Sequence, residues 1–248
     1  MTREINRQKI REAGGCLYTI GVGPGDPELL TLKAVRLLRE CRIIAIPHKD
    51  RENCVAYQIA RQAVPEIDEK ICLPLPMPMT KDQEILEKSH RAAAEAVAEK
   101  LQAGEDVALI TLGDPAVYST GFYIQERMRG LGYETKMVSG ITSFCAAAAR
   151  LGNALVSGAE ELHVIPASYQ IEEALKLSGT KVLMKAGRQM AEVKRMLADS
   201  GLEAIMVENC GMEGERVYES LEEIPDQASY YSLLIAEDRK KTGQGRIG

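Results

Sequence analysis

The sequence is poor in aromatic residues: it holds no tryptophan and two phenylalanines, and aromatic side chains make up 4% of its 248 residues. The core must therefore be mostly aliphatic, which favours parallel strands that are covered by helices on both faces. The scarcity of rings also argues against a protein that stacks single-stranded bases on aromatic side chains.

Long apolar runs and an excess of positive charge are also lacking. No run approaches the roughly eighteen apolar residues that a membrane-spanning helix needs, and the first fifteen residues are polar, with no apolar signal core. The formal net charge is −5, so no global positive field exists to hold nucleic acid or an anionic membrane. We therefore expect a cytoplasmic protein that binds neither nucleic acid nor membranes.

Closely spaced cysteines are missing as well. The six cysteines are Cys16, Cys41, Cys54, Cys72, Cys145 and Cys210. No pair is closer in the sequence than Cys41 and Cys54, whereas metal sites usually need short ligand spacings such as CxxC. We expect free, mostly buried thiols and no bound metal.

The chain does contain a regular alternation of short apolar runs and segments with helical spacing. Residues 17–22 form an apolar run that stops at a glycine cluster, residues 29–41 carry apolar side chains at helical spacing, and residues 43–46 read as the next strand. Further strands are predicted at 71–75, 107–112, 134–138, 162–165, 182–184, 205–208 and 232–236. Further helices are predicted at 55–64, 82–101, 121–131, 143–151, 171–177 and 190–200. This alternation indicates an α/β fold.

The length allows two α/β domains of similar size. A division near residues 115–120 would give each half its own sheet. We expect an N-terminal extension over residues 1–14, a first domain over 15–117, a second domain over 118–240 and a C-terminal tail over 241–248.

Three glycine-containing loops follow predicted strands and precede predicted helices: Gly21–Pro27, Gly113–Ser119 and Gly140–Ser143. In open α/β sheets, ligands bind beyond the carboxyl ends of the strands, and helix N-termini there offer free N–H groups. The first loop is not a GxGxxG dinucleotide fingerprint, because its third glycine comes too early and Pro24 stiffens the loop. Taken alone, it is as consistent with a tight turn as with a ligand loop.

Taken together, these loops resemble the signatures of the tetrapyrrole (corrin/porphyrin) methylase family. Residues 18–34 resemble the opening signature, residues 111–115 the strand that ends in Gly-Asp-Pro, and residues 138–143 the third hallmark. Met184-Lys185 and Val207-Glu208-Asn209 match the later ones, so that the likeness extends over residues 16–237. The resemblance implies a homodimeric, SAM-dependent methyltransferase with a two-domain tetrapyrrole-methylase fold, in which each domain is a sheet flanked by helices and the active site lies in the cleft between them.

Two positions depart from the family pattern. Ser139 stands where relatives usually have proline, and Cys210 stands where they often have glycine. The serine loosens its turn but leaves the backbone amides available. The thiol of Cys210 is compatible with a main-chain contact to the ligand, but not with a ligand that packs on the Cα atom.

Within the family, the chain resembles the branch that methylates carbon 20 of precorrin-2 or cobalt-precorrin-2 on the way to the corrin ring of vitamin B12 (cobalamin). Residues 113–120, 150–152 and 160–167 carry this likeness. Relatives on the same scaffold methylate other corrinoid carbons, uroporphyrinogen III, diphthamide precursors or ribosomal RNA, and RNA is disfavoured here by the charge balance. A non-catalytic SAM-binding protein or a nucleotide-binding subunit is the alternative from a different class.

The resemblance also assigns roles to individual residues. It implies that SAM is bound by Pro24, Leu112, Gly113, Asp114, Val117, Ser119, Thr120, Thr142, Ser143, Met184 and Cys210. Asp114 could accept a hydrogen bond from the ligand's ammonium group or simply brace its loop. Because the macrocycle bears acetate and propionate groups, we expect cationic side chains to bind it, with His48, Lys49, Lys185 and Arg188 as candidates. No residue stands out as a general base.

Overall fold

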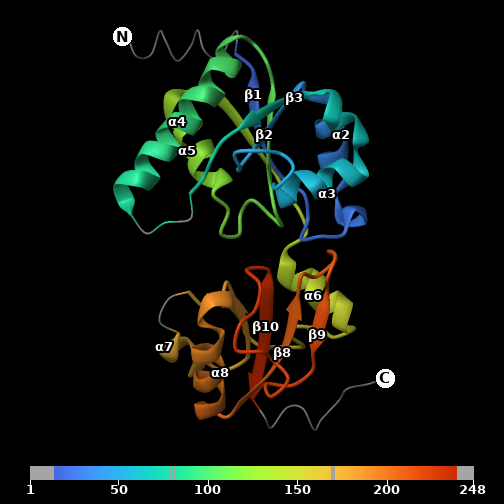
Figure 1. The fold of residues 1–248 in the computed structure, drawn as a ribbon, viewed down its shortest axis with the longest axis vertical. Helices are drawn as coiled ribbons and strands as arrows, with labels where there is room; N and C mark the ends of the chain where they lie inside the picture. Colours follow the sequence, from blue (N-terminus) through green and yellow to red (C-terminus); the bar gives the residue numbers. More distant parts are fainter. Residues whose placement is uncertain (1–13, 79, 81, 169–170, 239–248) are drawn as a thin grey trace. The chain divides into compact units, whose positions relative to one another are not determined.

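The computed structural model describes residues 14–78, 80, 82–168 and 171–238, apart from the side chains of Arg188 and Asp238. These residues form two compact units, the first ending at Thr142 and the second beginning at Ser143 (Figure 1). The predicted C-terminal tail and all but the last residue of the predicted N-terminal extension lie outside the described residues.

The first unit contains a parallel sheet of five strands in the order β3-β2-β4-β1-β5. The strands are β1 (Cys16–Gly21), β2 (Ile43–Ile46), β3 (Ile71–Pro74), β4 (Val107–Thr111) and β5 (Glu134–Val138). Every residue of β2 and β4 is buried, which explains why both segments are continuous apolar runs rather than alternating ones. Because all five strands run the same way, the loops after them emerge at one edge of the sheet.

Helices cover both faces of this sheet (Figure 1). Helices α2 (Leu32–Glu40) and α3 (Val55–Ala63) lie on one face, and α4 (Gln83–Gln102) and α5 (Gly121–Leu131) on the other. Alternate strand residues supply the two cores, so that Ile44 packs towards α2 and α3 while Ile43 packs towards α4. Two short 3-10 helices, η1 (Pro27–Leu29) and η2 (Pro65–Glu69), complete the unit.

The second unit contains a mixed five-stranded sheet in the order β6-β7-β10-β8-β9. The strands are β6 (Leu162–Pro166), β7 (Thr180–Met184), β8 (Leu202–Glu208), β9 (Arg216–Tyr218) and β10 (Ser232–Asp238). Strands β6 and β7 are parallel, whereas β10 is antiparallel to both β7 and β8. Helix α6 (Ser143–Leu151) lies on one face, and α7 (Glu172–Leu175), α8 (Met190–Asp199) and the 3-10 helix η3 (Gly187–Gln189) belong to the other side (Figure 1).

The predicted α/β architecture with two helix-flanked sheets is confirmed, and some details differ from the sequence prediction. The expected domain boundary at residue 117 falls inside the first unit, because β5 returns to pair in parallel with β1. Strand β9 was not predicted. It is three residues long, with one aliphatic side chain, so the sequence carries no periodic signal there.

Three general findings bear on function. Among the described residues, no helix is long and apolar enough to cross a membrane. All six cysteines are free thiols, and Cys145 is the exposed one. Within the same part of the chain, no group of three or more histidine, cysteine, aspartate or glutamate residues could hold a metal ion.

Candidate functional site

The loops after β1 and β4 are joined to each other by main-chain hydrogen bonds. The Val22 amide donates to the oxygen of Thr111 at 3.0 Å. Gly23 and Gly113 form a reciprocal bridge: the Gly113 amide donates to the Gly23 oxygen at 2.7 Å, and the Gly23 amide donates back at 3.2 Å. Two of the three predicted signature loops are therefore one hydrogen-bonded structure.

Glycine is required where these loops meet because the backbones touch. A Cβ atom on Gly21 would lie 2.5 Å from the oxygen of Gly113, and one on Gly140 would lie 2.2 Å from the same oxygen. Gly113 itself has a φ of +69°, and a Cβ atom there would make only an ordinary van der Waals contact, with the main-chain oxygen of Ile141 at 3.9 Å. Gly21 and Gly140 thus serve close approach, and Gly113 serves a left-handed turn.

Asp114 ties the β4 loop to the β5 loop. Its Oδ1 accepts from the amide of Ala116 at 2.7 Å, and its Oδ2 accepts from the amide of Gly140 at 2.9 Å. Both carboxylate oxygens are therefore bonded to main-chain amides without any ligand. Two roles were predicted for Asp114. These hydrogen bonds support the one in which its carboxylate braces the loop, and contact with a ligand remains a prediction.

The rest of the β4–α5 loop is also held by hydrogen bonds. The hydroxyls of Thr111 and Ser119 lie 2.9 Å apart, and the amide of Gly121 donates to the Ser119 oxygen at 3.1 Å. The Val117 amide donates to the oxygen of Asp114, and Thr120 is the exposed N-cap residue of α5. The sequence suggested Ser119 as a ligand contact, and the structure adds a structural role for its hydroxyl.

One side chain at this edge leaves hydrogen-bonding capacity unused. The hydroxyl oxygen of Thr142 is buried and has no hydrogen-bond partner among the described residues. Leu112 packs its side chain against the core at the end of β4, directly before Gly113. A buried hydroxyl without a partner is costly, and hydrogen bonding to a ligand would remove that cost. Pro24 directly follows Gly23 of the bridge and is itself buried.

The second unit brings three of the predicted residues to one region. Met184 ends β7 and Cys210 lies two residues beyond the end of β8, and both pack in one apolar cluster with Ala147 of α6. Ser143 is the first residue of that helix. The residues directly after the two strand ends, Lys185 and Asn209, both have positive φ values, of 63° and 52°. The chain therefore turns sharply after β7 and after β8.

Asn209 is held in its turn by the segment that directly precedes β10. Its amide donates to the oxygen of Tyr231 at 3.0 Å, and its Oδ1 accepts from the Ser229 hydroxyl at 2.9 Å. The preceding residue, Glu208, accepts from the amide of Ser229 at 2.6 Å and from the Tyr218 hydroxyl at 3.2 Å. By sequence, Glu208 and Asn209 match a family signature but have no assigned role. In the structure their side chains hold this turn, and the turn positions Cys210.

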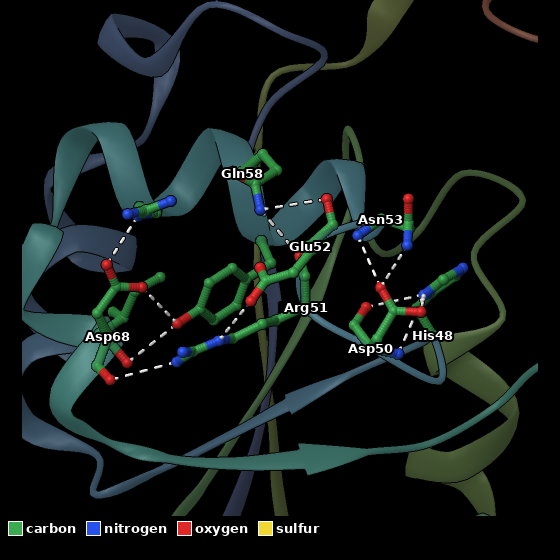
Figure 2. A network of polar contacts seen from close by, with 10 residues as sticks. His48, Asp50, Arg51, Glu52, Asn53, Gln58 and Asp68 are labelled. Carbon is green, nitrogen blue, oxygen red and sulfur yellow. Dashed lines mark hydrogen bonds and ion pairs between the residues drawn. The ribbon is translucent and has the colours of Figure 1, made fainter.

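Residues 47–54, here called the His48 loop, connect β2 to α3 at the carboxyl edge of the first sheet (Figure 2). His48 Nδ1 lies 2.8 Å from the main-chain oxygen of Asp50. Asp50 Oδ1 in turn accepts from the amide of Asn53 at 2.9 Å and from its side-chain nitrogen at 2.7 Å. These hydrogen bonds, with that of the Asn53 amide first, lower the pKa of the Asp50 carboxyl.

The far side of the His48 loop is anchored to η2. Arg51 Nη1 donates to the oxygen of Asp68 at 3.3 Å, and Gln58 Nε2 donates to the oxygen of Arg51 at 2.9 Å. Asp68 itself accepts from the Tyr57 hydroxyl at 2.9 Å and pairs with Arg61 at 2.7 Å. Sequence reasoning missed this network, since nothing in the local pattern links Arg51 to a residue seventeen positions away.

The predicted cations lie in different environments. Lys49 is exposed in the His48 loop of the first unit. Lys185 follows β7 in the second unit, and burial lowers the pKa of its ammonium group. Arg188 lies in η3, but its side chain is outside the described part of the structure.

Comparison with known proteins identifies the relatives of this chain. The family model for Tetrapyrrole (Corrin/Porphyrin) Methylases matches residues 16–225. The Precorrin-2 C(20)-methyltransferase of a Sinorhizobium species is 32% identical over 235 residues, which cover 89% of this chain and 94% of the relative. The Cobalt-precorrin-2 C(20)-methyltransferase of Salmonella typhimurium is also 32% identical, over 229 residues that cover 89% of this chain and 95% of the relative.

Other relatives are longer than this chain. Cobalamin biosynthesis protein CobIJ of Mycobacterium tuberculosis is 31% identical over 234 residues, which cover 90% of this chain and 46% of the relative. The chain thus spans about half the length of CobIJ.

A solved structure with the same fold is the uroporphyrin-III C-methyl transferase of Thermus thermophilus in complex with S-adenosylhomocysteine. Its TM-score is 0.68 at 22% sequence identity, and the match covers 92% of this chain and all of that chain. The family match extends over most of the sequence and includes the loops after β1, β4, β5, β7 and β8. This chain belongs to the tetrapyrrole (corrin/porphyrin) methylase family.

Proposed function

We propose that this chain is a SAM-dependent C-methyltransferase that methylates carbon 20 of precorrin-2 or cobalt-precorrin-2 in cobalamin biosynthesis. Support comes from the two relatives that bear these names and that match this chain over nearly their whole length. The observation on which the proposal depends most is the interlocked set of signature loops, in which Gly21, Gly113 and Gly140 meet at the carboxyl edge of the first sheet.

The residues at that edge suit SAM as a ligand. Thr142 offers a buried hydroxyl without a partner among the described residues, Gly113 has no side chain that would crowd a ligand, and Leu112 supplies an apolar wall. A ligand that combines a polar amino-acid chain with an adenine ring needs such a mixture of hydrogen-bonding groups and apolar surface. The Thermus relative was solved with S-adenosylhomocysteine, the product that SAM leaves.

We assign SAM binding to loop residues of both units, as the family resemblance implies. The residues in the first unit are Pro24, Leu112, Gly113, Asp114, Val117, Ser119, Thr120 and Thr142, and those in the second unit are Ser143, Met184 and Cys210. Cys210 packs in the same apolar cluster as Met184, so its thiol can provide apolar surface there. The role of Asp114 is mainly indirect, because its carboxylate positions Gly140.

SAM, when bound, supplies an electrophilic methyl group to an electron-rich carbon of the macrocycle. The protein's task is then to hold donor and acceptor in line, which can lower the barrier by roughly 7–11 kcal/mol. A rigid edge serves that task, and the hydrogen bonds of Asp114, Gly23 and Ser119 make this edge rigid. Lys49, in the loop after β2, is a candidate to bind the acidic side chains of the macrocycle, and Lys185 is a further one.

The proposed reaction is tested by anaerobic incubation with SAM and either precorrin-2 or its cobalt form. We expect the mass of one form to rise by one methyl group, with a matching change in the absorption spectrum. Uroporphyrinogen III serves as the control acceptor, and methylation of it instead would overturn the assignment to carbon 20. Calorimetric titration with S-adenosylhomocysteine comes first, because absence of binding would contradict the proposal altogether.

We also propose that the enzyme is a homodimer in the cytoplasm, as the family resemblance implies. Sedimentation equilibrium of the purified chain tests the first point and should give twice the mass of one chain. Fractionation of cells that express it tests the second point.

A further inference from the structure

The His48 loop lies beside the proposed SAM loops at the same edge of the sheet. Strand β2, which this loop follows, pairs directly with β4, and β4 leads into Gly113 and Asp114. Methylation of a ring carbon that carries hydrogen requires a base, because the proton on that carbon must leave. The first unit holds no base within the proposed SAM-binding set other than Asp114, whose oxygens already bind two amides.

The ring of His48 is oriented by its own loop. Nδ1 lies 2.8 Å from the main-chain oxygen of Asp50 and 3.5 Å from its Oδ2, and both are acceptors. The amide of Asp50 lies 3.2 Å from the same nitrogen and would favour the other tautomer. The shorter contact and the nearby carboxylate favour the proton on Nδ1, which leaves Nε2 with a free lone pair in the neutral ring.

The second ring nitrogen points away from the network. Figure 2 shows Nδ1 turned towards Asp50 and the other nitrogen of His48 directed out of the loop. Nε2 has no hydrogen-bond partner among the described residues. The loop behind it is fixed by the Asn53 bonds to Asp50 and by the anchor from Arg51 to Asp68. A base that is held by a hydrogen bond on its opposite nitrogen is the arrangement that general-base catalysis uses.

The other two histidines of the chain are placed differently. His163, on β6 of the second unit, has its Nε2 2.8 Å from the oxygen of Ser178, so that nitrogen is already engaged. His90 lies in the middle of α4 and stacks on Tyr123, with the ring centroids 5.1 Å apart. His48 is thus the one histidine of the chain in a loop at the carboxyl edge.

We infer that His48 Nε2 accepts the proton that leaves the methylated ring carbon, an inference that rests on the proposed function. The π electrons of that carbon form the new C–C bond, and the S–CH₃ bond breaks with its electron pair on sulfur. The C–H bond then breaks, its electrons restore the double bond of the ring, and the proton moves to Nε2. The imidazolium keeps its Nδ1–H bond to Asp50, with the Asp50 carboxylate nearby to stabilise the charge.

The test compares His48→Ala and His48→Gln with the wild-type enzyme, and uses His90→Gln as the matched control. We expect both His48 variants to lose about 10²–10⁴-fold in the rate of methylation, since this is the usual contribution of a general base. Their dissociation constant for S-adenosylhomocysteine should not change. His90→Gln should behave like the wild type.

Two further measurements separate a base from a merely structural residue. Imidazole added to His48→Ala should restore part of the rate, and deuterium at carbon 20 should slow that variant more than it slows the wild type. A His48→Ala enzyme with a wild-type rate, or a slow one with neither rescue nor isotope effect, would overturn the inference. A wild-type enzyme that fails to methylate either form of precorrin-2 would overturn the proposed function and this inference with it.

Discussion

At Gly140 the main chain passes so close to two other loops that no side chain fits. A Cβ atom there would lie 2.2 Å from the oxygen of Gly113 and 2.9 Å from the carbonyl carbon of Gly21, and all of these are backbone atoms. Gly140→Ala should therefore destabilise the protein by about 1–3 kcal/mol, the usual cost of overpacking. Calorimetric unfolding measures this as a lower Tm.

Gly130 provides the matched control for that substitution. It lies in α5, and a Cβ atom there would meet nothing within 4 Å. Gly130→Ala should stabilise the protein by about 0.5–1 kcal/mol, because alanine loses less conformational entropy in a helix. If both variants unfolded at the same temperature, the close approach at Gly140 would not have the importance that we give it.

The sequence revealed which residues matter at this edge better than it revealed what they do. The glycines could be predicted because each follows an apolar run, where a strand ends and a helix is about to begin. Gly21 and Gly140 both lie so close to the oxygen of Gly113 that a Cβ atom would not fit. This close approach depends on the order of the strands in the sheet, which local sequence patterns do not contain. The contact from Asp114 to Gly140, over twenty-six residues, is hidden for the same reason.

At the scale of elements, α6 is tied to the segment before β9 by one ion pair. Arg150, in the last turn of α6, binds Glu215, which also accepts from the amide of Gly211 at 2.7 Å. The Gly211 bond and then Arg150 lower the pKa of Glu215 below its ordinary value of 4.5. A depressed pKa in the folded state means that this stabilisation is present above pH 4.5 and is lost as the pH falls through the folded-state pKa.

Glu215→Gln should consequently destabilise the protein by about 1 kcal/mol at neutral pH and by progressively less below pH 4.5. Urea unfolding over this pH range measures the difference from the wild type. Glu173→Gln is the control, because its pair with Lys176 is highly exposed on both sides and should contribute little. A Glu215→Gln effect that stayed constant down to about pH 3 would show that the charge is not the cause.

The elements themselves could be predicted almost completely. Aliphatic runs such as 43–46 and 107–112 mark buried parallel strands, and helical spacing marks the segments between them. Strand β9 could not be predicted, because three residues are too short to show a period. The local pattern also could not predict to which sheet a strand belongs. Strand β5 alternates between exposed and more buried residues at an edge, and its pairing with β1 places it in the first unit.

At the scale of the whole molecule, the proposed SAM-binding residues are divided between the two units. Those in the first unit stand on a parallel sheet, where the carboxyl ends of strands gather by topology. In the second unit, Met184 and Cys210 flank the positive-φ turns after β7 and β8 of a mixed sheet, and Ser143 begins α6. Both units are thus needed to supply the full set of residues, although each has its own core.

Binding of S-adenosylhomocysteine should accordingly protect amides in both units from hydrogen exchange. We expect slower exchange at residues 112–120 and 140–142 of the first unit and at residues 184–186 and 208–211 of the second. At a ligand concentration about a hundredfold above the dissociation constant, the gain in stability should be about 2.7 kcal/mol. Helix α4, which carries none of the assigned residues, is the internal control. Protection confined to the first unit would remove Ser143, Met184 and Cys210 from the binding site, and the ligand would then be held by the parallel sheet alone.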